Sequence, residues 1–320
     1  MKALWQELCA RAAAQGFLSA WATDVRPFDA WHAACLAAGN GMTPGMAHDP
    51  AALMPEAARI VVLAMPYAWA GAPQAGQARI SPFYPTSNRA HARIEAAAEP
   101  LRAAGYRALI RPALPAKAAA ERAGAGVYGR NGLITGQTYG SAVAFQLVLT
   151  DAPLPFSEAP AQEALSACEG CAACVRACPV GALDGTGRVD TARCLRAHML
   201  PTEPIPEPLR AAMGDRLLGC DDCQTACPHN AHRAAAAQED APPHVALAPL
   251  LAGERDALDV LGALVGDNYA RKQRVQAQAA LVAGNSGDPR WLPSLRGLTQ
   301  SESPAAREHA AWAIACLSQR

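Results

Sequence analysis

Long apolar runs are absent from this sequence of 320 residues. No stretch approaches the roughly 20 apolar residues that cross a bilayer, so the sequence predicts no contact with a membrane. The opening stretch, MKALWQELCARAAAQGF, carries acidic and basic residues where a signal peptide has its apolar centre. We therefore expect a cytoplasmic protein.

An excess of charge of either sign is also absent. The chain has 28 basic and 28 acidic residues, and its net charge is zero. Any contact with RNA therefore has to come from a local patch and not from the whole surface. With 51% hydrophobic and 18% charged residues, the chain can bury a sizeable core and form two or three domains.

The order of patterns along the chain predicts an α+β protein in three parts. Residues 1–155 alternate helical patterns with short apolar runs, which indicates an α/β domain. Residues 156–238 begin with a proline-rich segment and hold most of the cysteines. Residues 239–320 follow a second proline-containing linker and are rich in alanine, which predicts helices.

Three elements of the first domain are predicted from local pattern. The apolar runs RIVVLAMPY (59–67) and SAVAFQLVLTD (141–151) predict buried strands. The stretch PTSNRAHARIEAAAEPLRAAGY (85–106) predicts a helix whose N-terminus is capped by Ser87 or Asn88.

The last part contains an internal repeat. RVQAQAAL (274–281) and REHAAWAI (307–314) match at an offset of 33 residues, with a turn and the start of a further helix between them. This offset predicts one or two α-solenoid units of the HEAT type, which bury their small-residue faces by stacking. Two unrelated alanine-rich helices are the alternative.

Cysteine is plentiful, with 11 residues. The cytoplasm keeps thiols reduced, so metal binding is favoured over disulfides. ACEGCAACVRACPVGAL has the spacing C-x2-C-x2-C-x3-C-P of two-cluster ferredoxins, in which the fourth cysteine binds the other cluster. GCDDCQTACPHN ends in the same C-x3-C-P pattern, and one more cysteine lies between the two sets. This crossed logic assigns two sets of ligands for [4Fe–4S] clusters, one of Cys168, Cys171, Cys174 and Cys227, the other of Cys178, Cys194, Cys220 and Cys223.

Zinc sites and redox-active motifs share part of this cysteine spacing. A tetrahedral zinc site also uses C-x2-C pairs, but it needs only four ligands and does not explain the Cys-Pro at the end of both sets. A redox-active C-x-x-C motif acts as one pair and not as overlapping pairs. The remaining cysteines, Cys9, Cys35 and Cys316, are isolated, and we expect them to be small buried hydrophobic residues without a function.

From about residue 55 onward the chain resembles the epoxyqueuosine reductases, cobalamin-dependent iron–sulfur enzymes of tRNA queuosine synthesis. The resemblance depends on AERAGAGVYGRNGLI (120–134), the strand ending LTD (149–151), the eight cysteines, GCDDCQTACPHN, and GNSGD followed by REHAAWAI. It implies a base-off corrinoid between the first two domains, reduced through the clusters by a flavodoxin-type or ferredoxin-type donor. No D-x-H-x-x-G corrinoid motif is present. By position the implied corrinoid contacts are Gly126, Tyr128, Asn131, Asp221 and Gln224, with ordinary loop structure as the alternative for each.

One departure from the family concerns the proton donor. In the family an aspartate about fourteen residues before the glycine that matches Gly124 protonates the opening epoxide. Here that place falls at Ile110 or Arg111, and residues 107–120 contain no acid. Removal of a positioned general acid costs about 100-fold to 10,000-fold in rate, so the change is not neutral for the same reaction.

Other side chains of the implied cavity are candidate proton donors. They are Tyr128, Lys117 and His91, and each has a structural alternative: a core tyrosine, a solvated turn lysine and a surface histidine. The resemblance therefore implies a cobalamin-dependent reductase whose leading substrate is a modified tRNA nucleoside. A corrinoid reductase for a small molecule (reductive dehalogenase-like or corrinoid-reactivating) and a non-catalytic electron-transfer ferredoxin are the alternatives.

Charge in the last part indicates where RNA would bind. Residues 270–320 contain seven basic and three acidic residues. Stacked repeats would align Arg271, Lys272 and Arg274 with Arg307 along one rim, which suits the phosphate backbone of tRNA. A solvated helix face is the alternative.

Overall fold

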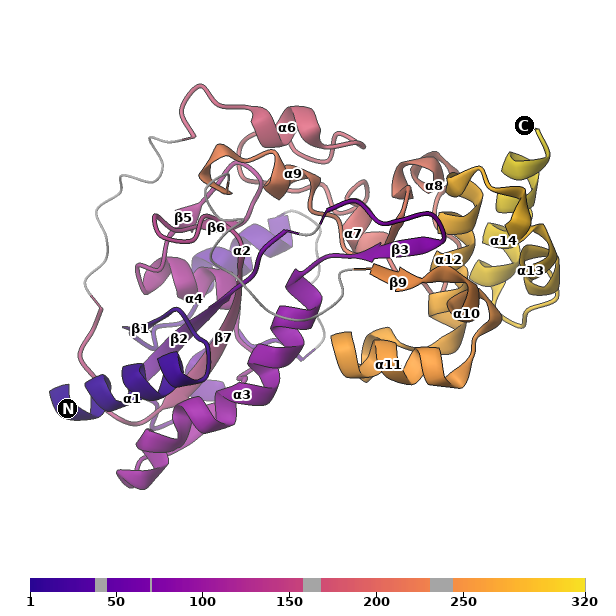
Figure 1. Ribbon diagram of the computed structural model, residues 1–320. Helices are drawn as coiled ribbons and strands as arrows, with labels where there is room; N and C mark the ends of the chain where they lie inside the picture. The colour runs from indigo at the N-terminus through magenta and orange to yellow at the C-terminus, as the bar shows by residue number, and fades with distance from the viewer. Residues whose placement is uncertain (38–44, 70, 158–167, 231–243, 320) are drawn as a thin grey trace.

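The computed structural model describes residues 1–37, 45–69, 71–157, 168–230 and 244–319. The N-terminal part and the C-terminal helices form the two ends of an elongated molecule, and the cysteine-rich part lies along and between them (Figure 1). None of the helices in these ranges is long and apolar enough to cross a membrane.

The N-terminal part is built on a four-stranded antiparallel sheet with the order β1-β2-β7-β4. Its strands are β1 (Ser19–Thr23), β2 (Arg59–Pro66), β7 (Val143–Thr150) and β4 (Ala108–Ile110). Strands β2 and β7 pair along their whole length, from Arg59 opposite Thr150 to Pro66 opposite Val143. The two strands predicted from apolar runs are therefore confirmed.

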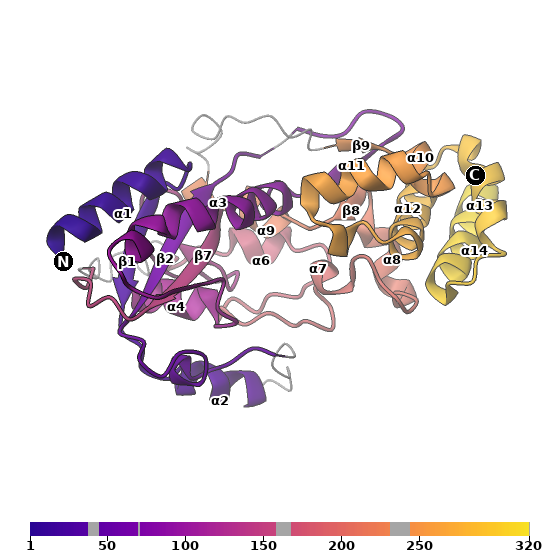
Figure 2. The same ribbon diagram turned by 90° about the horizontal axis from the view of Figure 1, so that it is seen from below.

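Helices cover both faces of this sheet. Helices α1 (Lys2–Ala14) and α3 (Phe83–Ala103) pack on one face, and α4 (Ala116–Arg122) packs on the other, as Figure 2 shows. Val61 and Leu63 of β2 point toward α1 and α3, whereas Ile60 and Val62 belong to the core on the α4 side. Because successive residues of a strand face opposite sides, a strand buried on both faces reads as a continuous apolar run.

Helix α3 begins earlier than the sequence predicted. Its N-cap residue is Pro82, and no side chain caps it. Ser87 and Asn88 therefore lie inside the helix, and the prediction that one of them caps it is wrong. Proline at the N-cap leaves no side-chain acceptor there, and the Asn88 side chain is used elsewhere: its Nδ2 atom donates to the carbonyl oxygen of Ala263 at 2.9 Å. This bond ties α3 to the C-terminal helices.

A second sheet joins the three predicted parts of the chain. Strand β3 (Gln77–Ile80) lies between β8 (Arg216–Leu218), to which it is parallel, and β9 (His244–Ala246), to which it is antiparallel. The three strands come from residues 1–155, 156–238 and 239–320 respectively. The three parts share one sheet, so they do not fold as separate units. The predicted boundary at residues 238 and 239 lies outside the described residues.

The C-terminal part consists of packed helices. They are α10 (Leu247–Ala252), α11 (Arg255–Val265), α12 (Lys272–Ser286), α13 (Leu292–Leu298) and α14 (Pro304–Ser318). The two matched repeat segments lie in α12 and α14, which pack so closely that a Cβ atom on Gly284 would approach Ala313 Cβ to 2.7 Å. Both segments are helices as predicted, and their assignment to the HEAT class stays a prediction.

Short elements make up the rest of the described chain. A hairpin of β5 (Val127–Tyr128) and β6 (Ile134–Thr135) follows α4. The cysteine-rich part contains the helices α6 (Ala173–Ala177), α7 (Leu195–His198), α8 (Glu207–Met213) and α9 (Asp222–Thr225). Helix α2 (Asp29–Ala37) and the 3-10 turns Pro50–Ala52, Pro228–Asn230, Asp267–Tyr269 and Pro289–Trp291 complete it.

Candidate functional site

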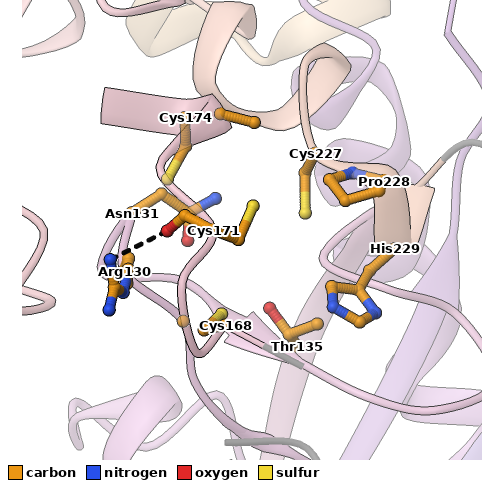
Figure 3. A pocket seen from close by; sticks show the side chains of 11 residues that line it. Arg130, Asn131, Thr135, Cys168, Cys171, Cys174, Cys227, Pro228 and His229 are labelled. Carbon is orange, nitrogen blue, oxygen red and sulfur yellow. Dashed lines mark hydrogen bonds between the residues drawn. The ribbon is translucent and has the colours of Figure 1, made fainter. Parts of the chain in front are cut away.

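Four thiols line one pocket of the structure. They are Cys168, Cys171 and Cys174 from the first cysteine set and Cys227 from the second, as Figure 3 shows. The other lining residues come from three places, the β5–β6 hairpin, the start of α6 and the turn after Cys227: Gly129, Arg130, Asn131, Thr135, Ala173, Pro228 and His229. The structure thus brings together the four cysteines that the sequence assigned to one cluster.

Local structure explains how residues close in sequence surround this space. Gly170 has a φ of +67°, and the Cys171 N–H donates to the Cys168 carbonyl at 3.2 Å, so the chain turns sharply before α6 begins. The guanidinium of Arg130 donates to the Cys171 carbonyl at 2.8 Å. This bond holds the cysteine loop against the hairpin of the N-terminal part.

Four thiols around one pocket are the number and type of ligand that a [4Fe–4S] cube takes. A zinc site needs four ligands that converge on one point. A [4Fe–4S] cube instead takes one thiolate at each of four corners, so its ligands stand around a space. The thiols fit a cluster.

Three cysteines of the second predicted set also lie near one another. Burial raises the pKa of Cys223, and the charges of Cys220 and Cys194 raise it further. Burial likewise raises the pKa of Cys220, to about 11. A thiol with a raised pKa keeps its proton until a bound metal ion displaces it. Cys178 lies at the end of α6, where its Sγ atom accepts a hydrogen bond from the Ala182 N–H at 3.2 Å. Its membership of the second set stays a prediction.

Two of the predicted corrinoid contacts belong to a buried polar network. Asp221 and Gln224 are each 7% exposed. The Ser81 hydroxyl donates to Asp221 Oδ1 at 2.8 Å, and the Tyr67 hydroxyl donates to Gln224 Oε1 at 3.0 Å. Burial raises the pKa of Asp221 to about 6, against the effect of the Ser81 hydrogen bond. The two side chains fasten the second cysteine loop to the end of β2 and the start of α3.

Sequence reasoning missed another member of this network. Asn230 Oδ1 accepts a hydrogen bond from the Ser141 N–H at 2.8 Å, and its Nδ2 donates to the Gln224 carbonyl at 2.7 Å. Gly140 has a φ of +59°, and a Cβ atom there would lie 2.0 Å from Asn230 Oδ1. The sequence did show a signal, because Asn230 closes the CPHN motif.

The other predicted corrinoid contacts lie in the β5–β6 hairpin. A Cβ atom on Gly126 would lie 2.6 Å from the Thr135 carbonyl oxygen, so the hairpin itself requires this glycine. Asn131 is buried, lines the thiol pocket, and accepts a hydrogen bond from the Leu133 N–H at 3.2 Å. Tyr128 is half-buried, and burial followed by the nearby Glu121 raises its pKa.

The three predicted proton donors lie in different settings. Lys117 Nζ donates to the Gly132 carbonyl at 2.8 Å and lies 5.8 Å from the centre of the Tyr128 ring. His91 is exposed on α3, and its carbonyl accepts a hydrogen bond from Arg111. The structure brings Lys117 and Tyr128 together and leaves His91 on the surface of the helix.

The cysteines outside the two sets are not fully buried. Cys9, Cys35 and Cys316 are all partly exposed, so the expectation of buried hydrophobic residues is wrong in degree. On α1 the buried positions are Leu8 and Ala12, and Cys9 lies beside Leu8. Cys35 of α2 is close enough to Lys117 for its charge to act on the pKa of that amine.

One buried donor near the network has no internal acceptor. Trp69 packs edge-on against Tyr67, with the ring centres 5.3 Å apart. Its Nε1 atom is buried and makes no hydrogen bond within the part of the chain that the structure describes. Buried donors are almost always paired. Trp69 Nε1 is therefore a buried donor whose acceptor is not among the described residues.

The basic residues of the predicted RNA rim are not equivalent. Arg274 Nε donates to the Leu200 carbonyl at 2.5 Å, and Arg307 donates to the carbonyls of Ser301 and Glu302. Arg271 and Lys272 are exposed at the start of α12. Two of the four predicted phosphate contacts are thus engaged with the backbone.

Residues 167–230 match a family described as "4Fe-4S double cluster binding domain". This match confirms the two-cluster nature of the cysteine-rich part.

Two curated relatives are epoxyqueuosine reductases. The one from Bacillus subtilis is 33% identical over 205 residues, which are 62% of this chain and 52% of that protein. The one from Pseudomonas aeruginosa is 30% identical over 294 residues, 83% of this chain and 78% of that protein. The matched stretch spans about half the length of the first of these relatives.

Solved structures agree over nearly the whole chain. An epoxyqueuosine reductase from Bacillus subtilis, in which an aspartate catalytic loop is swung out of the active site, superposes with a TM-score of 0.84 at 26% identity. The alignment covers 99% of this chain and 91% of that one. A second epoxyqueuosine reductase, with an epoxyqueuosine-modified tRNA stem loop, superposes with a TM-score of 0.83 at 25% identity, covering 99% and 90%.

Proposed function

The chain belongs to the epoxyqueuosine reductase family, whose enzymes use two [4Fe–4S] clusters and cobalamin, and we propose that it reduces epoxyqueuosine in tRNA. The observation that carries this proposal is the pocket of Cys168, Cys171, Cys174 and Cys227. Its four thiols come from both cysteine loops, which is the crossed arrangement of two-cluster ferredoxins. An external one-electron donor of the flavodoxin or ferredoxin type supplies the electrons.

The residues around the second cysteine loop suit a bound corrinoid. When bound, a corrinoid supplies a strongly nucleophilic low-valent cobalt that attacks an electrophilic substrate. Trp69 offers a buried N–H without an internal acceptor, and the half-buried Tyr128 offers a ring face beside Lys117. Asp221 and Gln224 act indirectly in this proposal, because their polar atoms hold the loop that carries Cys220 and Cys223.

The structural relative with a modified tRNA stem loop supports tRNA as the partner. In this chain the C-terminal helices share a core with β3 and β8, since Ile80, Leu217 and Val275 pack in one cluster. The helices therefore hold a fixed position relative to the cysteine loops. The exposed Arg271 and Lys272 lie at the start of α12 and are the side chains that would contact phosphate.

One observation favours a second candidate, a corrinoid reductase that acts on a different electrophile. Residues 107–120 contain no carboxylate, whereas the Bacillus subtilis structure has an aspartate catalytic loop. Ile110 lies in β4, and Arg111 has a φ of +54° and donates to the His91 carbonyl. Neither supplies a proton at neutral pH.

A reconstitution experiment decides between these candidates. The full chain is purified anaerobically, loaded with iron, sulfide and cobalamin, and given a reductant with tRNA that contains epoxyqueuosine. We expect conversion to queuosine, measured by mass spectrometry of the nucleosides. Protein that binds iron and corrinoid but leaves the nucleoside unchanged would overturn the proposal in favour of the second candidate.

A further inference from the structure

Lysine is rare in this chain. Of its 28 basic residues, 25 are arginines and three are lysines. Lys2 and Lys272 begin helices α1 and α12, where any solubilising cation would serve. Lys117 instead lies in α4 and faces the β5–β6 hairpin. Arginine stays charged in proteins, whereas lysine releases its proton when its surroundings disfavour the charge. Most basic residues of this chain are arginines. Lys117, which can release its proton, lies beside the turn that lines the cluster pocket.

The position of the Lys117 amine connects it to the electron path. Nζ donates to the carbonyl of Gly132, a residue of the turn between β5 and β6. The neighbouring residues of this turn, from Gly129 to Asn131, line the thiol pocket of Figure 3. Gly132 itself has a φ of +71°, and a Cβ atom there would lie 2.8 Å from the Gly187 carbonyl of the cysteine-rich part. One tight turn therefore separates Lys117 from the site of the first cluster.

The amine has hydrogen-bonding capacity to spare. An ammonium group carries three donors, and the structure gives Nζ a single acceptor, the Gly132 carbonyl. No carboxylate lies within ion-pair distance of Nζ among the residues that the structure describes. Lys117 is exposed to solvent, yet desolvation by the surrounding protein acts on it. Nζ therefore keeps two donors for a further acceptor.

Charged groups on several elements act on the pKa of Lys117. Desolvation lowers its pKa, and the guanidinium of Arg196 on α7 lowers it further, while Cys35 on α2 acts in the opposite direction. Tyr128 presents its ring, and Glu121 of α4 accepts a hydrogen bond from the backbone N–H of Tyr128 instead of pairing with the amine. The amine is therefore a stronger acid than an ordinary lysine.

We propose that Lys117 is the catalytic acid of this chain, donating a proton to the substrate oxygen as the first carbon–oxygen bond breaks. This inference rests on the proposed reduction of an epoxide. In that reduction two electrons and two protons are consumed, both carbon–oxygen bonds break, a carbon–carbon double bond forms, and the oxygen leaves as water. The electrons come from the external one-electron donor through the clusters. Lys117 gives the first proton, becomes a neutral amine and regains a proton from water, and the second proton also comes from water.

Neither of the other two candidates fits this role as well. Burial raises the pKa of Tyr128, which makes its hydroxyl a weaker acid than an ordinary tyrosine. His91 is exposed on α3 and lies next to Arg111, away from the hairpin. Tyr128 instead orients the amine through the face of its ring, 5.8 Å from Nζ.

Two substitutions at one position separate proton donation from charge. Lys117→Arg keeps the cation and its donors toward Gly132 but removes the transferable proton, and Lys117→Met removes both. If Lys117 is the acid, single-turnover reduction of epoxyqueuosine in tRNA slows about 100-fold or more in both variants. Iron content and corrinoid binding stay at wild-type levels, and Lys2→Arg serves as the matched control. A Lys117→Arg protein that turns over at the wild-type rate would overturn the assignment.

A second measurement does not depend on activity. Amine acylation with trace acetic anhydride over a range of pH, followed by mass spectrometry of the peptides, reports the titration of each lysine. We expect Lys117 to become reactive at lower pH than Lys2 and Lys272 in the same sample. Lys117 titrating together with these two would overturn the proposal. A wild-type protein that never converts the tRNA would instead overturn the proposed function, so the two failures are distinguishable.

Discussion

Nε2 of His309 accepts a hydrogen bond of 2.8 Å from the backbone N–H of Ile205. His309 belongs to the last helix of the chain, and Ile205 lies between two predicted ligands of the second cluster, Cys194 and Cys220. The other ring nitrogen, Nδ1, bonds to the Ala277 carbonyl at 2.9 Å. His309 has no exposed surface, so this single side chain joins α12, α14 and the cysteine-rich part.

Replacing His309 by Phe should destabilise the whole protein. The substitution leaves the Ile205 N–H without a partner in the interior, which costs about 1–3 kcal/mol, and it also removes the ring's bond to the Ala277 carbonyl, which keeps its bond within α12. We expect a lower midpoint of urea unfolding, followed by circular dichroism. His91→Phe is the matched control, because His91 is exposed, and it should change stability by less than about 0.5 kcal/mol. Equal effects of the two substitutions would contradict the bridging role of His309.

The same histidine should make stability depend on pH. Burial lowers the pKa of His309, against the effect of its bond to the Ala277 carbonyl. The folded state thus binds a proton less readily than the unfolded state, so the stabilisation is present above the unfolded pKa and is lost as pH falls through the folded pKa. Burial raises the pKa of Asp221 to about 6. The contribution of Asp221 to stability therefore falls as pH rises, opposite to that of His309. We therefore predict that the difference in unfolding free energy between wild type and His309→Phe shrinks as pH falls below the ordinary pKa of histidine, about 6.5, because Asp221 is present in both proteins and cancels. A constant difference would contradict this reasoning.

Iron content should reveal how the cysteines are divided. Wild-type protein should hold about eight irons and eight sulfides per chain. Cys227→Ala should abolish the cluster of Cys168, Cys171 and Cys174 and leave about four irons, and Cys178→Ala should abolish the other cluster. Electron paramagnetic resonance of the reduced protein would identify which cluster is lost. Cys9→Ala is the control and should keep both. The same signal lost in Cys178→Ala and in Cys174→Ala would show that the ligand sets are not crossed.

Corrinoid binding should depend on the indole of Trp69. Trp69→Phe keeps an aromatic ring beside Tyr67 and removes the N–H that lacks an acceptor. Loss of one hydrogen bond of about 1 kcal/mol weakens binding roughly five-fold. The measurement is calorimetry with cob(II)alamin, and its electron paramagnetic resonance spectrum should show the base-off form. Trp5→Phe on α1 is the matched control. Unchanged affinity in Trp69→Phe would remove this residue from the cofactor site.

Binding of tRNA should weaken with salt in proportion to the phosphates contacted. Arg271 and Lys272 are exposed, whereas Arg274 is engaged with Leu200. Substituting Arg271 and Lys272 by Ala should therefore flatten the dependence of log affinity on log salt by up to about two ions. Arg11→Ala, on the helix at the opposite end of the molecule, is the control. An unchanged slope in the double variant would place the RNA elsewhere.

Local patterns in the sequence were enough for several features. The runs at 59–67 and 141–151 are strands because two-sided burial requires uninterrupted apolar residues, and this requirement is visible in the sequence itself. Cysteine spacing also predicts a cluster from the sequence alone. A cube requires short distances between its ligands, so several of them are neighbours along the chain. The predicted cap of α3 is wrong because a cap depends on where the helix begins, and the N-cap Pro82 lies five residues before Ser87 and six before Asn88.

By itself, the sequence determined the cysteine spacing of a double cluster, the two buried core strands, the helices that hold the C-terminal repeat and the resemblance to a reductase family, because each depends on residues close together in the chain. Only the tertiary structure decided that Tyr67 bonds to Gln224, that β3 joins strands from both later parts, and that Lys117 lies behind the turn that lines a cluster pocket. Those contacts join residues up to 169 positions apart, because Gln77 pairs with Ala246 in the adjacent strand. No periodicity encodes such a pairing, because it follows from how the sheets and helices pack once the apolar faces are buried.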